Sequence, residues 1–60
     1  MNASDISTFA RQLFAAQGAK AIAEAAHKAE ACRQVGDSGQ ARVWERVESA
    51  LRELRGPRQG

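Results

Sequence analysis

The most regular run of large apolar side chains lies near the C-terminus. Trp44, Val47, Leu51 and Leu54 follow one another at intervals of three, four and three residues. An α-helix turns once in 3.6 residues, so this spacing places the four side chains on one helical face. The pattern predicts a helix over residues 38–55, against which the preceding chain packs.

A second amphipathic pattern opens the chain. Apolar side chains recur there at positions i, i+3, i+4, i+7 and i+8, namely Ile6, Phe9, Ala10, Leu13 and Phe14. This is the apolar stripe of a helix that covers a core. We therefore expect a helix over about residues 5–17, with Ser4, Asp5 or Ser7 as its N-cap.

The middle of the chain is rich in alanine, the best helix former, and predicts a helix over residues 19–35 with a face of small side chains. Gly18 leaves two alternatives, a break between two helices or a bend in one long helix. Glycine costs about 1 kcal/mol inside a helix but is favoured just after a helix ends. We favour the break, because it lets Phe9, Leu13 and Phe14 fold back towards Trp44.

The clearest turn is Gly36-Asp37-Ser38-Gly39. Gly36 suits the positive φ that often follows a helix, and Asp37 or Ser38 can cap the next one. A link this short predicts an antiparallel hairpin of the second and third helices. The expected fold is thus all-α, a small three-helix unit built on a helical hairpin. Residues 1–60 form a single domain, in which residues 56–60 are a frayed tail.

Composition adds that the core must be small. The chain holds 13 alanines but only ten Leu, Ile, Val and Phe residues in 60. A domain of this size buries only about 60% of its unfolded surface, so a partner chain is a natural aid to stability. We predict a protein–protein interaction module or accessory subunit, self-association included. The candidate interface is apolar: Phe9, Leu13, Phe14, Trp44 and Leu51.

Charge supports a second hypothesis. Nine Lys and Arg against seven Asp and Glu give a net charge of +2, and arginines concentrate in the third helix. An Arg-rich helix can bind nucleic acid, but glutamates interrupt the arginines here, which disfavours that function. If the chain stays monomeric at all concentrations, we expect Phe9, Phe14 and Trp44 to close into one intrachain cluster. The surface for a different protein partner is then expected beside Arg42, Glu45 and Arg46.

Chemistry offers a third hypothesis, a small redox protein that uses Cys32. His27 and Cys32 are the only soft metal ligands, whereas a structural zinc site needs four. We find no catalytic pair and no phosphate-binding loop. The sequence therefore predicts no enzyme, no cofactor and no metal.

The cellular compartment can be inferred from targeting signals and cysteine content. We find no signal-peptide pattern and no apolar run of the ~20 residues that a membrane helix needs. A single thiol suits a reducing compartment. We expect a cytoplasmic protein without a membrane partner.

The C-terminal half has a recognisable pattern of its own. Its characteristic positions are Ala29 or Ala31, Gly36, Asp37, Ala41, Trp44, Val47, Ala50 and Leu54. In these the chain resembles short bacterial helical-hairpin proteins of uncharacterised function, which have a Gly-Asp turn before a Trp-containing helix. The resemblance implies an α-helical hairpin and brings no activity or site residue with it.

Overall fold

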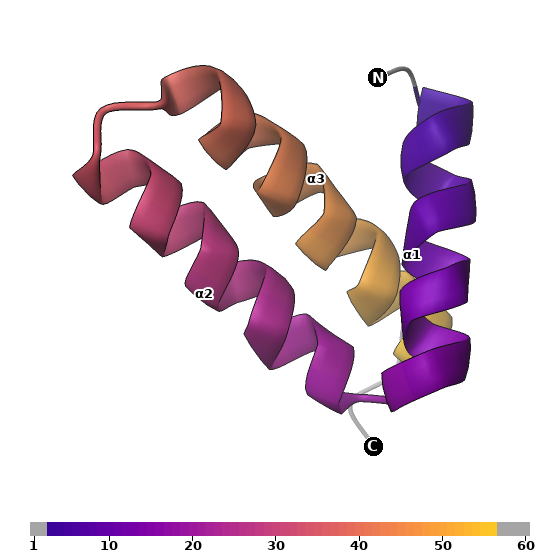
Figure 1. The fold of residues 1–60 in the computed structure, drawn as a ribbon. Coiled ribbons are helices and arrows are strands. Elements are labelled where there is room, and N and C mark those ends of the chain that lie inside the picture. Colours follow the sequence, from indigo (N-terminus) through magenta and orange to yellow (C-terminus); the bar gives the residue numbers. More distant parts are fainter. Residues whose placement is uncertain (1–2, 57–60) are drawn as a thin grey trace.

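The computed structural model describes residues 3–56, which form three α-helices packed against one another (Figure 1). Helix α1 covers Ala3–Gln17, α2 covers Lys20–Gln34 and α3 covers Ser38–Arg55. No strand occurs within the described range. The predicted all-α three-helix unit is confirmed.

The start of α1 differs from the prediction. The helix begins at Ala3, so Ser4, Asp5 and Ser7 lie inside its first two turns and none of them is the N-cap. Alanine is a strong helix former and extends the helix upstream of the expected cap. Asp5 still lies in the first turn, where a carboxylate interacts favourably with the helix dipole.

The chain breaks at Gly18, as the favoured alternative predicted. Gly18 has a φ of 65°, and its N–H donates to the carbonyl of Phe14 at 2.7 Å. This is the bond of a left-handed glycine cap, which ends α1. Helix α2 then starts at Lys20 and runs back along α3.

The second turn follows the predicted chemistry closely. Gly36 has a φ of 81°, and its N–H donates to the Arg33 carbonyl at 3.1 Å. The Asp37 N–H donates to the Cys32 carbonyl at 2.8 Å, which completes a Schellman motif. The Asp37 carboxylate then accepts from the Gln40 N–H at 3.1 Å and caps α3. The outcome is the antiparallel α2–α3 hairpin (Figure 1).

Gly36→Val should lower the free energy of unfolding by roughly 1–2 kcal/mol or more, because a side chain strains the left-handed conformation. A Cβ at Gly36 would meet no atom within 4 Å, so crowding does not contribute to the loss. Gly39→Ala is the control: Gly39 has no positive φ, and its Cβ would meet only the Asp37 carboxylate, at 3.8 Å. Urea unfolding measures the stability of both variants. If Gly36→Val proves as stable as Gly39→Ala and the parent, the proposed role of this turn is wrong.

The core lies where the three helices meet, and it is made largely of alanine. The buried residues in the described range are Ile6, Ala10, Ala21, Ala25, Ala29, Ala41, Val47 and Leu51. Five of these eight are alanines, and only Val47 and Leu51 are large side chains with no exposed surface. The alanines of α2 recur every four residues, so their small side chains let α3 approach closely.

Two large apolar side chains in the described range are exposed. Leu54 is 40% exposed although it continues the face of Leu51, because it lies in the last turn of α3. Val35 is 79% exposed because α2 has already ended at Gln34. At the end of α3, the Gly56 N–H donates to the carbonyls of Arg52 and Glu53, both at 3.2 Å. The rest of the predicted tail, residues 57–60, lies outside the described range.

Candidate functional site

An aromatic contact joins the three helices. The rings of Phe9 on α1 and Trp44 on α3 meet edge to face, with 5.7 Å between centroids and 67° between planes. Lys28 on α2 places its Nζ 5.7 Å from the Trp44 ring centroid, within the range of a cation–π contact. Trp44 thus interacts with side chains of both other helices, and the indole helps to hold the hairpin against α1.

The other predicted interface residues belong to the same cluster. Leu13 and Phe14 are half-buried and pack against the core, as Phe9 and Trp44 do. Leu51 lies beneath them with no exposed surface. The structure therefore brings all five predicted residues together within one chain. Four of them keep some surface for a partner, and their role as an interface stays a prediction.

A groove runs along the opposite edge of α3, beside the N-terminal half of α1. It has a volume of about 540 Å³ and opens widely to solvent. Its lining comes from both helices: Ile6, Ser7, Arg42, Glu45, Arg46, Ser49, Ala50 and Glu53. The sequence indicated Arg42, Glu45 and Arg46 as a second partner surface. It gave no signal for Ser7, Ser49 or Ala50, since their position depends on how α1 crosses α3.

The charges in the groove are only partly neutralised by the chain itself. Glu45 accepts from Arg33, whereas Arg42, Arg46 and Glu53 form no ion pair with any side chain in the described range. Each of these three side chains is exposed. Among the described residues, two unpaired guanidinium groups therefore stand one helical turn apart, and an unpaired carboxylate stands nearer the end of α3.

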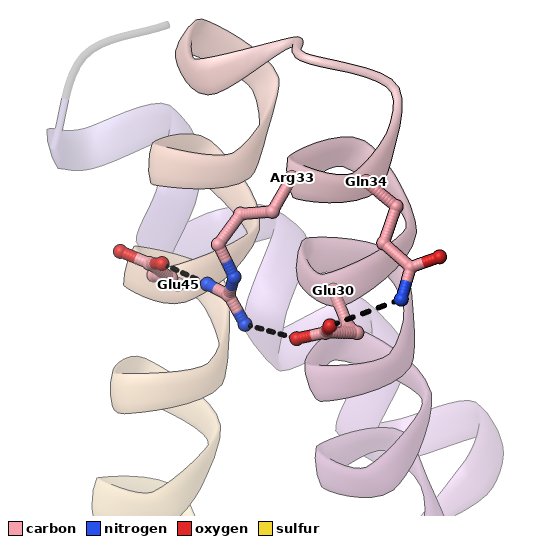
Figure 2. Close-up of polar contacts among 4 residues, drawn as sticks. All are labelled: Glu30, Arg33, Gln34 and Glu45. Carbon is pink, nitrogen blue, oxygen red and sulfur yellow. Dashed lines mark hydrogen bonds and ion pairs between the residues drawn. The ribbon is translucent and has the colours of Figure 1, made fainter.

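The hairpin carries an ion-pair network on its surface (Figure 2). Arg33 donates to Glu30 at 2.8 Å and also to Glu45, so it links α2 to α3. Gln34 donates to the second oxygen of Glu30 at 3.3 Å. Exposed pairs of this kind stabilise a fold little. The main consequence is that Glu45 is already neutralised where it lines the groove.

These contacts shift two pKa values. The hydrogen bond from Arg33, with a smaller contribution from Gln34, lowers the pKa of Glu30, and the same hydrogen bond raises the pKa of Arg33. Because folding lowers the pKa of Glu30, its small stabilisation is present above the unfolded pKa and is lost as the pH falls through the folded one. The network thus links α2 to α3 at the surface and contributes little to stability.

His27 and Cys32 are the remaining side chains that could carry chemistry. His27 is exposed on α2 and Cys32 is half-buried. Within residues 3–56, no three His, Cys, Asp or Glu side chains gather closely enough to hold a metal ion. Among the helices described, none combines the length and apolar character that a membrane span requires.

Comparison of the chain with protein-family models, curated proteins and solved structures finds no match. The resemblance of the C-terminal half to bacterial hairpin proteins therefore stays a prediction.

Proposed function

We propose that this chain is a small protein–protein interaction module, either self-associating or an accessory subunit of a larger complex. The observation that supports it best is the composition of the core, in which five of eight buried residues are alanines. Buried apolar area contributes roughly 25 cal/mol per Å², and an alanine offers little area. A partner that binds the folded chain adds stability by mass action.

The side chains left at the surface agree with this proposal. Phe9, Leu13, Phe14 and Trp44 are half-buried in the single chain, so a partner could cover the remainder. Aromatic residues and arginine are enriched at protein interfaces. We place the module in the cytoplasm, since its single thiol, Cys32, suits a reducing compartment.

A nucleic-acid-binding function is the second candidate. The guanidinium groups of Arg42 and Arg46 favour it, because neither forms an ion pair within residues 3–56. Phosphate-binding surfaces concentrate positive charge. Here Glu53 lines the same groove and has no neutralising partner in the described range. We rank this candidate lower for that reason. A redox role for Cys32 ranks lower still, because the thiol is half-buried and the sequence holds no second cysteine with which it could form a disulfide.

Two measurements on the intact chain test the proposed function. The first is affinity isolation of the tagged protein from its native host, before and after nuclease treatment. The second is sedimentation and thermal melting over a hundredfold range of concentration. We expect either a stoichiometric protein that survives nuclease, or a melting temperature that rises with concentration. A monomer with a constant melting temperature and no protein partner would refute the proposal. Material lost on nuclease treatment would promote the nucleic-acid alternative.

A further inference from the structure

We propose that the groove-facing side of α3 binds the same side of a second copy of this chain, with the two α3 helices antiparallel. The two-fold axis passes close to Ser49 and Ala50. This inference rests on the proposed function and specifies its self-associating form. It assigns the groove, and not the aromatic cluster, as the contact surface.

Two of the charges along this side of α3, Arg46 and Glu53, are placed to pair with the same two residues of a second copy. Arg42, Arg46, Ser49 and Glu53 follow at intervals of four, three and four residues, so they share one face. The positive side chains come first and the carboxylate last. In an antiparallel pair centred between Ser49 and Ala50, each Arg46 therefore faces the partner's Glu53.

Spacing and side-chain size fit this arrangement. Arg46 and Glu53 are seven residues apart, or about 10 Å along the helix at 1.5 Å per residue. Ser49 and Ala50 lie midway between them and line the groove, and their small side chains let two helices approach. An adjoining hollow is lined by Ser7, Arg11, Ala50, Glu53 and Leu54. Leu54 is 40% exposed, so apolar surface is available beside the charges. Arg11 forms no ion pair with Glu53 among the described residues, so the Glu53 carboxylate can still pair with an arginine of the second copy.

Other ligands would pair with only some of the charges on this surface. An acidic peptide or nucleic acid would satisfy Arg42 and Arg46, but Glu53 in the same groove would repel it. A second copy supplies a carboxylate for Arg46 and an arginine for Glu53 at once. In an isologous contact of this kind every favourable pair forms twice, because residue i of each copy meets residue j of the other.

Charge reversal tests the proposal. Arg46→Glu and Glu53→Arg should each weaken the dimer about tenfold or more, because each turns two attractive contacts into two repulsive ones. An equimolar mixture of the two variants should form a heterodimer, and the doubly substituted chain should dimerise like the parent. Both positions are exposed, and circular dichroism checks that the variants fold. Lys20→Glu makes the same charge change at an exposed site on α2 and should leave the dimer unchanged.

Sedimentation equilibrium gives the dissociation constants. Loss of the dimer in each single variant, with recovery in the mixture, supports the proposal. A parent chain that stays monomeric across the concentration range overturns it, and so does a dimer that neither substitution weakens. Both of these outcomes leave the proposed function standing. The first leaves a different protein partner, to be found by affinity isolation, and the second places the self-contact on another surface.

Discussion

Leu51→Ala should lower the free energy of unfolding by about 2–5 kcal/mol, the range for a buried leucine truncated to alanine. Leu51 has no exposed surface and belongs to the core cluster with Val47. Its neighbours in that cluster include Ala21 and Ala25, whose short side chains cannot move in to fill the cavity. Chains of this length have a total stability of roughly 3–9 kcal/mol, so this variant approaches the unfolding threshold at room temperature.

Leu54→Ala is the matched control for this prediction. It removes the same atoms from the same helix, three residues further on, but from a side chain that is 40% exposed. Its cost should be clearly smaller, because less apolar area returns to water and a cavity can fill with solvent. Urea unfolding of both variants gives the comparison. Equal losses would mean that Leu54 is covered in solution, as the charge-paired dimer at this edge of α3 would allow at high concentration.

The helices and their turns could be predicted because they depend on local chemistry. The spacing of the apolar residues depends only on the helix that contains them. The Gly36-Asp37 turn ends one helix and caps the next through hydrogen bonds that span at most six residues. The break at Gly18 was decided by the same kind of bond, from its own N–H to Phe14. Such features need no knowledge of tertiary packing.

The burial of individual side chains could be predicted only in part. Helical spacing gives the direction in which Leu54 points, but not how far α1 and α2 extend to cover it. The same limit applies to the groove, which exists because α1 crosses α3 beside Ala50 and leaves Arg42 and Arg46 exposed. A crossing angle depends on how whole faces interlock, and that information is spread over all three helices.

The aromatic cluster shows that an apolar pattern can select residues that meet in the fold and still leave their role open. The apolar pattern selected Phe9 and Trp44, and the structure places their rings in contact. What the pattern did not contain is Lys28, which reaches the indole from α2. Because its partners lie on all three helices, Trp44 first serves the fold, and any contact with another protein uses only the surface that remains.

Trp44→Ala should therefore lower the free energy of unfolding by about 2–3 kcal/mol. A fully buried tryptophan costs about 3–5 kcal/mol when truncated, and this one is half-buried. The edge contact with Phe9 contributes about 0.5–1.5 kcal/mol of the loss, and the Lys28 contact about 0.5–1 kcal/mol. Trp44→Phe is the control, since it keeps an aromatic ring in the cluster and should recover most of the stability. Thermal and urea unfolding measure both variants.

The same substitution separates stability from association. Trp44 and Arg46 lie on roughly opposite sides of α3, because two residues advance a helix by more than half a turn. Trp44→Ala should thus destabilise the fold while the chains that remain folded dimerise with unchanged affinity. Arg46→Glu should do the reverse, with dimerisation weakened and the fold of the single chain kept. If Trp44→Ala abolishes the dimer at temperatures where the chain is still folded, the contact surface lies on the aromatic cluster, and the charge-paired face of α3 is not the interface.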